Sequence, residues 1–448
     1  MEITANNPNR KSWLTVAENS DFPIQNIPFG VFLTKDDIIT IGTRIGDYAI
    51  DLGALHQLGY FDGIPLTDDI FLQDTLNDFI ADGRKTWRLV RNRIADIFDV
   101  KNSKLRDNAE HKDKIIFRMD EVEMQLPVSV GDYTDFYASK EHATNVGSLF
   151  RDPENALLPN WLQIPIGYHG RSSSIVPSGT PIRRPIGQQR PNEGETTPNF
   201  GPSKLLDFEL EMAFITTVAN DLGDRIPIEE AEEYIFGLVL FNDWSARDIQ
   251  AWEYVPLGPF NAKNFGTTIS PWVVLADALE GFHGEGLVND VPPKEYLDEK
   301  RKDSVLHLNL DVSITSKSTP FHRYQEINSN LFKAAKGNTT KITQTNSKNL
   351  VWSWAQMLAH HSISGCDMRT GDLLGSGTIS GLEPGTQGSL LEQTQGGKVL
   401  VQLEGGEERK FVQDGDTITI TGWAGESDDG LVGFGECSGT ILPAIKRN

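Results

Sequence analysis

The chain has 448 residues, 38% of them hydrophobic and 23% charged, so it can bury a large core and is expected to fold as two domains. Its formal net charge of -22 argues against binding to nucleic acids or anionic membranes, since both require clustered Lys and Arg. With two cysteines, a polar N-terminus and no apolar run of membrane-spanning length, the sequence predicts a cytoplasmic protein.

The N-terminal part of the sequence predicts a small β domain. Val/Ile/Thr-rich runs are separated there by Gly and Asp, a pattern typical of a small barrel or sandwich. Apolar residues from Trp87 to Ile97 follow at near-helical spacing. Residues 98–122 are charged and poor in apolar side chains, so we expect an N-terminal domain of residues 1–122 and a larger domain of residues 123–448. The expected strands of the first domain are 30–34, 38–42 and 48–52.

The larger domain is also expected to be mainly β. Residues 235–241 form an apolar run that predicts a buried strand. Two polar, Gly- and Pro-containing stretches, residues 187–200 and 279–302, are expected to be loops. Further strand-like runs close the chain at 398–403, 417–421 and 439–442.

Residues 206–214 alternate apolar and acidic side chains and contain the most informative acids of the chain. This alternation predicts a strand with Glu209 and Glu211 on one face and apolar side chains on the other. Same-face neighbours on a strand lie roughly 7 Å apart, so two long carboxylates could hold one cation between them. The alternative is a half-exposed strand whose glutamates are solvated.

A polar segment follows the predicted strand 235–241. If a helix begins near Asn242, then Asp243, Arg247, Gln250 and Tyr254 lie on one of its faces. A carboxylate, a guanidinium, an amide and a phenol in one row form a polar surface, unlike the apolar face by which a helix packs. The alternative is an exposed Asp–Arg pair, which contributes only about a few tenths of a kcal/mol.

Lys263 begins another polar stretch, after a turn with two prolines. Together with Gly266 and Thr267 it would place an ammonium, backbone carbonyls and a hydroxyl near the preceding segment. Such oxygen-rich surroundings suit hard cations and negatively charged substrates.

Asp135 and His142 are seven residues apart, which on a helix would place them on one face, with His142 near a metal bound by Asp135. A lone histidine is also common as a satisfied structural residue. Glu392 ends a small apolar run. A carboxylate beside a histidine is what a water-activating base needs, although the sequence alone does not bring Glu392 to His142.

Taken together, these segments resemble the fumarylacetoacetase family. The similarity spans nearly the whole chain, and motifs this long and in this order are highly specific. The matching stretches are 21–23 and 28–32 in the first domain, and 131–137, 142–147, 156–161, 167–171, 206–214, 242–250, 252–260 and 365–381 in the second.

The resemblance implies a bound divalent cation, usually calcium or magnesium. Its ligands, carried over by motif, are Asp135, Glu209, Glu211 and Asp243. The residues implied for a second cation, or for ordering the first, are Lys263, Gly266 and Thr267.

The implied reaction is hydrolysis of the carbon–carbon bond of 4-fumarylacetoacetate to fumarate and acetoacetate, the last step of tyrosine and phenylalanine degradation. His142 would be the general base and Glu392 would orient it. The donors to developing negative charge would be Arg247, Gln250 and Lys263. Contacts to the diketo-acid substrate would come from Tyr137, Arg151, Tyr168, Gln250, Tyr254 and Thr378.

The fold implied by the resemblance is a small SH3-like barrel followed by a larger β-roll, in a homodimer. The loops 187–200 and 279–302 depart from the family pattern, and Gln387 stands near Glu392 where the family often has Phe. Two alternatives stay open. One is a short-chain acylpyruvate hydrolase or decarboxylase on the same β-roll, which typically lacks the N-terminal domain. The other is a metal-stabilised binding module without catalysis, in which His142 and Glu392 have no chemical role.

Overall fold

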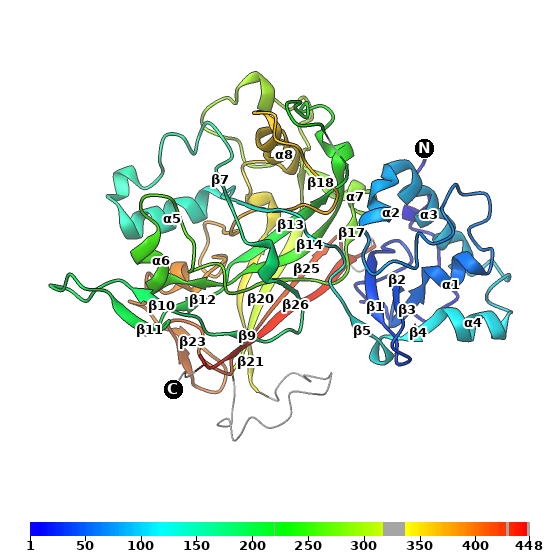
Figure 1. The fold of residues 1–448 in the computed structure, drawn as a ribbon, viewed down its shortest axis with the longest axis horizontal. Coiled ribbons are helices and arrows are strands. Elements are labelled where there is room, and N and C mark those ends of the chain that lie inside the picture. The colour runs from blue at the N-terminus through cyan, green and yellow to red at the C-terminus, as the bar shows by residue number, and fades with distance from the viewer. Residues whose placement is uncertain (219, 317–336, 427–429, 446–448) are drawn as a thin grey trace.

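A computed structural model describes residues 1–218, 220–316, 337–426 and 430–445 of the chain. The N-terminal strands and helices form one body, which packs against one end of a larger, mainly β part (Figure 1). The prediction of a mainly β protein with a small N-terminal β unit is confirmed.

The N-terminal body is built on a five-stranded antiparallel sheet in the order β4-β3-β2-β1-β5. The three strands expected from the sequence form its centre. Helix α3 forms where the helical spacing predicted it, and it buries Trp87, Val90 and Ile94 against the sheet core. The strands are β1 (Phe29–Leu33), β2 (Ile39–Ile45), β3 (Tyr48–Asp51), β4 (Ile116–Arg118) and β5 (Glu123–Met124). The helices are α1 (Leu52–Gln57), α2 (Asn77–Ala81), α3 (Gly83–Phe98) and α4 (Ala109–Ile115).

Strand β5 lies just beyond the proposed domain boundary at residue 122. It pairs with β1, so the N-terminal sheet contains residues on both sides of that boundary. The charged stretch 98–122 holds α4 and β4, and β4 pairs with β3 of the same sheet. The division of the chain at residue 122 stays a prediction.

The larger part contains two sheets. The first is eight-stranded, in the order β7-β6-β22-β13-β14-β16-β8 with β17 beside β14, and the second is five-stranded, in the order β21-β20-β25-β26-β9. The strands of the first are β6 (Tyr133–Phe136), β7 (Gly167–His169), β8 (Ile175–Pro177), β13 (Leu210–Thr216), β14 (Ile235–Asp243), β16 (Thr267–Ile269), β17 (Val274–Leu275) and β22 (Leu373–Gly375). Those of the second are β9 (Ile182–Arg183), β20 (Leu308–Thr315), β21 (Thr339–Asn346), β25 (Thr417–Ala424) and β26 (Val432–Leu442).

Strand β13 is buried on both faces, which differs from the expectation of one buried side. Its residues Leu210, Met212 and Phe214 join the core that includes the second sheet. Ala213 and Ile215 point the other way and join the core of the N-terminal body. The eight-stranded sheet therefore lies between two hydrophobic cores, and both are needed to bury it.

The prediction that residues 187–200 form a loop is wrong in part, because the two ends of this stretch pair as the antiparallel strands β10 and β11.

The remaining short helices and strands connect the sheets. These elements are α5 (Lys140–Phe150), α6 (Arg247–Glu253), α7 (Ala276–Leu279), α8 (Trp354–Ser362), α9 (Leu390–Gln393), β10 (Ile186–Gln189), β11 (Asn199–Pro202), β12 (Leu206–Asp207), β15 (Ser245–Ala246), β18 (His283–Gly284), β19 (Val305–Leu306), β23 (Val401–Gln402) and β24 (Glu408–Arg409).

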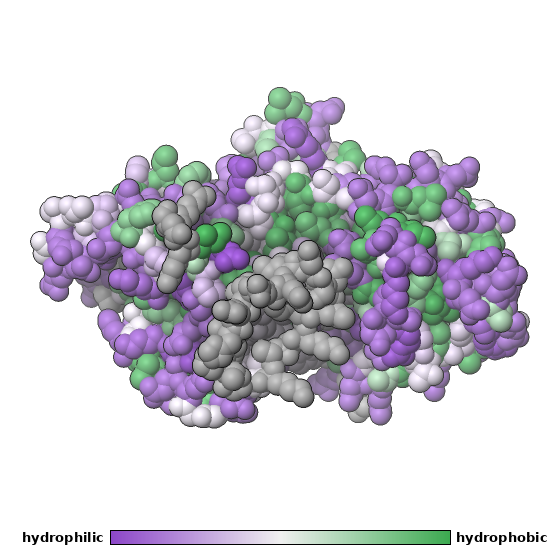
Figure 2. Space-filling view, turned by 60° about the horizontal axis from the view of Figure 1, so that its bottom comes forward, coloured by the Kyte–Doolittle hydropathy of each residue, from purple (hydrophilic) through white to green (hydrophobic). Residues whose placement is uncertain are grey.

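The surface is predominantly hydrophilic on the face shown in Figure 2, with smaller apolar groups between the polar ones. Within the described part of the chain, no helix combines the length and the apolar character needed to cross a membrane.

The burial of Glu299, in the segment 279–302, can be tested by the pH dependence of the protein's stability. Burial raises the pKa of its carboxyl to about 7, although hydrogen bonds from Ser353 and Ser304 oppose the rise. A pKa raised by folding contributes stability below the unfolded pKa of about 4.3, and this contribution is lost as pH rises through about 7. Glu299→Gln is neutral at every pH. We expect it to raise the thermal unfolding midpoint at about pH 8 and to change it little at about pH 5.

Glu295→Gln is the matched control for this measurement, because Glu295 is an exposed glutamate of the same segment. Thermal unfolding of both variants at the two pH values checks the expectation. An equal shift for Glu299→Gln at both pH values would contradict it.

Candidate active site

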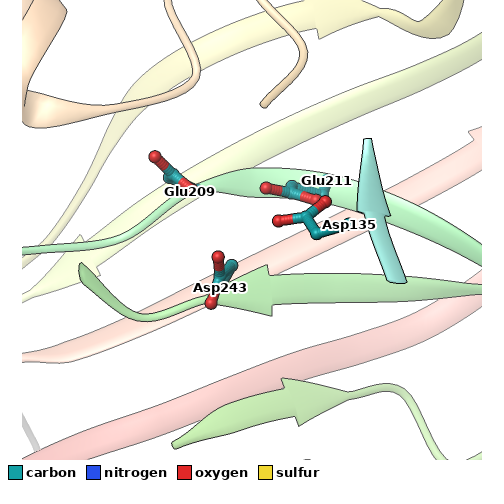
Figure 3. Close-up of side chains that lie close together, drawn as sticks. All are labelled: Asp135, Glu209, Glu211 and Asp243. Carbon is teal, nitrogen blue, oxygen red and sulfur yellow. The ribbon is translucent and has the colours of Figure 1, made fainter. Parts of the chain in front are cut away.

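Four acidic side chains meet where strands of the eight-stranded sheet end. Asp135 comes from β6, Glu209 immediately precedes β13, Glu211 lies within β13, and Asp243 is the last residue of β14 (Figure 3). One carboxylate oxygen from each lies within 4.8 Å of the others. The register explains the meeting, since β13 pairs with β14 on one side and with β22 on the other, and Gly375 of β22 is opposite Asp135.

Two of the helical expectations are wrong. Asp243 ends a strand and α6 begins at Arg247, so these residues do not share a helical face. Asp135 likewise lies in β6, whereas His142 lies in α5. The side chains nevertheless gather in one place, because the strand ends and the first turns of the two helices surround the same cavity. The expected convergence of Glu209 and Glu211 is present.

The acidic cluster is buried, and its charge is only partly balanced. Lys263 Nζ lies 2.6 Å from Asp243 Oδ2 and also contacts Glu209. Arg247 Nη1 lies 2.8 Å from Glu209 Oε1. Burial and the neighbouring carboxylates raise the pKa of Asp135 and of Glu211 well above the usual range. Burial also opposes the ionisation of Glu209, but Lys263 and Arg247 outweigh it and lower its pKa.

The oxygens left without donors fit a divalent cation. Within the described part of the chain, neither oxygen of Glu211 nor Oδ1 of Asp243 has a hydrogen-bond partner, although all three are buried. Carboxylate oxygens are the ligands that Ca²⁺ and Mg²⁺ prefer, and a buried acceptor without a partner is costly. Gly375 keeps the space open, because a Cβ there would lie 2.8 Å from Asp135 Oδ1 and 3.2 Å from Glu211 Oε2.

The three residues expected around a second cation lie at the edge of this cluster. Thr267 is opposite Asp243 in the pairing of β16 with β14, and Gly266 immediately precedes β16. Lys263 does not fit as a metal ligand. The two acids raise the pKa of its ammonium against the effect of burial, and an ammonium has no lone pair to donate. It is a counter-charge to the acids.

His142 and Glu392 form a buried pair despite their distance in sequence. His142 Nδ1 lies 2.7 Å from Glu392 Oε2. Glu392 also accepts hydrogen bonds from Asn145 Nδ2 at 3.0 Å, Ser380 Oγ at 3.0 Å and Ser389 Oγ at 2.7 Å. Burial opposes the ionisation of Glu392, but His142 and these donors lower its pKa. An ionised Glu392 holds the proton on Nδ1 and leaves Nε2 as the basic nitrogen.

One cavity of about 430 Å³ joins the acidic cluster to His142. Its wall is completed by apolar side chains, among them Leu157 and Trp161. Asp243, Glu392, Gly266 and Thr267 stand outside the lining. The predicted site residues that line the cavity are Asp135, Tyr137, His142, Arg151, Tyr168, Glu209, Glu211, Arg247, Gln250, Tyr254, Lys263 and Thr378.

The residues expected to contact substrate are arranged around both ends of this cavity. The Tyr168 hydroxyl lies 3.0 Å from Asp135 Oδ2 and 2.8 Å from Asp243 Oδ2, so it touches the acidic cluster itself. Tyr137 packs edge-on against His142, with ring centroids 5.3 Å apart. Arg151 donates to a backbone carbonyl of the cavity wall at 2.6 Å.

Four polar residues next to the site escaped the sequence reasoning. Asn145, Ser380 and Ser389 hold Glu392, and Asp207 holds Arg247 through a 3.0 Å ion pair. Asn145 lies three residues after His142 on the same helix, a spacing that could have indicated it. Ser389 lies three residues before Glu392, the spacing of a helix N-cap and its first turn, which could likewise have indicated it. Ser380 lies twelve residues before Glu392 and has no signal of this kind.

Two family models divide the chain between them. The model described as "Fumarylacetoacetase N-terminal" matches residues 25–127, and the model described as "Fumarylacetoacetate (FAA) hydrolase C-terminal" matches residues 132–442. A solved fumarylacetoacetate hydrolase from psychrophilic Exiguobacterium antarcticum has a similar fold, with a TM-score of 0.50 and 15% identity over 93% of this chain and 99% of that one. Fold and site thus define a protein of the fumarylacetoacetate hydrolase type.

Full-length relatives make the assignment narrower. The fumarylacetoacetase of Dictyostelium discoideum is 49% identical over 441 residues, covering 98% of this chain and 99% of the relative. That of Homo sapiens is 47% identical over 437 residues, covering 97% and 99%. The chain belongs to the fumarylacetoacetase family.

Glu211→Gln tests whether the acidic cluster binds a cation. The amide keeps the size of the side chain but replaces one of two carboxyl oxygens that have no hydrogen-bond partner in the described part of the chain. We expect the affinity for Ca²⁺ or Mg²⁺, measured by calorimetry, to fall at least about 10-fold. The control is Asp132→Asn, an exposed acid three residues before Asp135, which should bind like the wild type. Unchanged affinity in Glu211→Gln would show that the cluster is not the metal site.

Proposed function

We propose that the chain hydrolyses 4-fumarylacetoacetate to fumarate and acetoacetate, the activity for which its full-length relatives are named. The observation that carries the proposal is the single cavity in which a buried acidic cluster faces His142. Cleavage of a carbon–carbon bond in a β-diketone needs a stabilised enolate at one end and an activated water at the other. The cavity has groups suited to both tasks.

The acids Asp135, Glu209, Glu211 and Asp243 would hold the cation, Ca²⁺ or Mg²⁺. When bound, the cation supplies Lewis-acid stabilisation for the enolate that leaves as acetoacetate. Tyr168, which touches two of these acids, restricts their movement from the cavity side.

His142 acts as the general base. Glu392 keeps its Nδ1 protonated and its ring oriented, so Nε2 takes the proton of a water molecule. The water oxygen bonds to the carbonyl carbon of the fumaryl group, which becomes the new carboxylate carbon of fumarate, and forms a tetrahedral intermediate. The carbon–carbon bond then breaks, its electron pair remains on the acetoacetate part, and that carbon takes up a proton.

Arg247, Gln250 and Lys263 stabilise the negative charge of the tetrahedral intermediate. Arg247 Nη2 is buried and, within the described residues, has no hydrogen-bond partner, so it is a donor already desolvated before substrate arrives. Donors fixed in this way commonly contribute about 3 kcal/mol each to transition-state stabilisation. Ion pairs with Glu209 and Asp243 hold the Arg247 guanidinium and the Lys263 ammonium in place.

The substrate is held by polar residues that line the cavity. Tyr137, Arg151, Tyr168, Gln250, Tyr254 and Thr378 are the proposed contacts. Arg151 suits a terminal carboxylate of the diketo acid, because its charge is not taken up by the acidic cluster. The protein acts as a homodimer. Exposed apolar side chains near the cavity offer surface that a second copy of the chain could bury, among them Leu257, which is 95% exposed, and Phe260, which is 65% exposed.

The proposal is tested by following the loss of the diketone absorbance of 4-fumarylacetoacetate with and without chelator. We expect turnover that chelator abolishes and Ca²⁺ or Mg²⁺ restores. Faster turnover of an acylpyruvate would favour the alternative hydrolase. Cation binding without turnover of any diketone would favour the binding module.

His142→Ala separates base chemistry from metal binding. Loss of a general base commonly lowers turnover about 10²–10⁴-fold, and His142 is not one of the four clustered acids. We expect a fall of that size in kcat with unchanged Ca²⁺ affinity. His169→Ala, an exposed histidine outside the cavity lining, is the control. The role as base is wrong if His142→Ala keeps near-normal turnover, or if it loses its metal as well.

A further inference from the structure

We infer that Asp207 is a positioning residue that joins the two sides of the catalytic machinery. One side is the guanidinium of Arg247, and the other is helix α9, which carries Glu392. The inference rests on the proposed function for the roles of Arg247 and Glu392, and on the structure for the connection between them.

Asp207 is fully buried in β12 and accepts four hydrogen bonds. Oδ1 accepts from the backbone N–H groups of Phe208 and Leu390, both at 2.9 Å. Oδ2 accepts from the N–H of Leu391 at 2.9 Å and from Nε of Arg247 at 3.0 Å. All four partners are donors, so an ionised carboxylate satisfies every one of them, and no neutral side chain of the same size does so.

Helix α9 depends on this carboxylate. It has only four residues, so its first N–H groups have no partner within the helix, and so short a helix does not hold itself together. Ser389 accepts from the N–H of Glu392, while Asp207 accepts from those of Leu390 and Leu391. The backbone that carries Glu392, and through it His142, is thereby attached to β12.

The same carboxylate orients Arg247. Asp207 accepts from Nε, whereas Glu209 and Gln250 accept from Nη1 at 2.8 and 3.1 Å. A planar guanidinium held at two of its nitrogens cannot rotate. Nη2 is the nitrogen left over, and Arg247 lines the cavity.

One side chain therefore fixes the anion-stabilising group and the base-orienting helix with respect to each other. Catalytic groups must be held to within a fraction of an ångström, and small displacements far from the reacting atoms can lower rates about 10²-fold. Loss of Asp207 would displace both groups at once, without removing either of them.

Asp207→Asn is the variant that tests the connection. Asparagine keeps the shape of the side chain, and its one oxygen can keep one pair of the four donors. Its NH₂ group then faces the other pair, donor against donor. We expect kcat to fall about 10²-fold with little change in KM and with Ca²⁺ affinity retained.

The matched control is Asp248→Asn. Asp248 is the neighbour of Arg247 in sequence and also accepts hydrogen bonds, from Ser203 Oγ at 2.6 Å and from the N–H of Lys204 at 2.7 Å, but it touches neither α9 nor Arg247's guanidinium. It should keep near-normal kcat. Equal losses of kcat in the two variants would overturn the inference.

Double-mutant cycles distinguish positioning from general damage. If Asp207 acts through Glu392 and Arg247, then Asp207→Asn should lower kcat less in a Glu392→Gln background, and less in an Arg247→Lys background, than in the wild type. Additive losses in both backgrounds would mean that Asp207 only supports the fold.

Hydrogen exchange of the wild-type protein tests the connection without activity and without a variant that must fold. The N–H groups of Leu390 and Leu391 begin a short helix, where exchange is ordinarily fast, yet their bonds to Asp207 predict slow exchange. Fast exchange there would overturn the inference. Slow exchange in a protein that does not turn over 4-fumarylacetoacetate would instead refute the proposed function and leave the connection standing.

Discussion

The site depends on four carboxylates held together away from water. Like charges in a medium of low polarity repel strongly, and the cluster persists only because opposite charges are fixed beside it. Lys263 and Arg247 supply part of that positive charge. They lower the pKa of Glu209, whereas the pKa values of Asp135 and Glu211 stay above their usual range. Among the described residues, both oxygens of Glu211 and Oδ1 of Asp243 keep no hydrogen-bond partner, and these are where a divalent ion fits best.

The sheet supplies the rigidity that such a cluster requires. Each acid lies on or next to a strand whose neighbours are paired, and the sheet is packed between two cores. Apart from Lys263, the groups proposed to act on water and on developing charge lie instead on the short helices α5, α6 and α9 around the strand ends. These helices are attached by individual hydrogen bonds rather than by sheet pairing. Precision on the helical side therefore depends on single polar side chains such as Asp207, which bonds to Leu390 and Leu391 of α9 and to Arg247 of α6.

Much of the fold and site could be predicted from sequence, where the signal is local. Alternation at 206–214 predicted one strand where the structure has two, β12 and β13, but it correctly indicated that Glu209 and Glu211 converge. The apolar run at 235–241 predicted β14. Periodicity failed to predict that Asp243 lies in a strand, because β14 continues through polar residues whose side chains bond to the neighbouring segment of the chain. Asn242, for example, accepts from the N–H of Glu209 at 3.2 Å. Asp207 escaped notice because its partner Leu390 lies 183 residues away.

Strand β13 carries a further consequence for how chains of this fold can differ. Ala213 and Ile215 continue the row that begins with Glu209 and Glu211, and they pack against the N-terminal body together with Phe236 and Val239. A protein without that body would leave this apolar surface in water, at a cost of roughly 25 cal/mol for each Å² exposed. It must therefore carry polar residues at these positions or cover them with another element. The residue types at 213 and 236 are thus a sequence marker for the presence of the N-terminal body, independent of any residue that touches substrate.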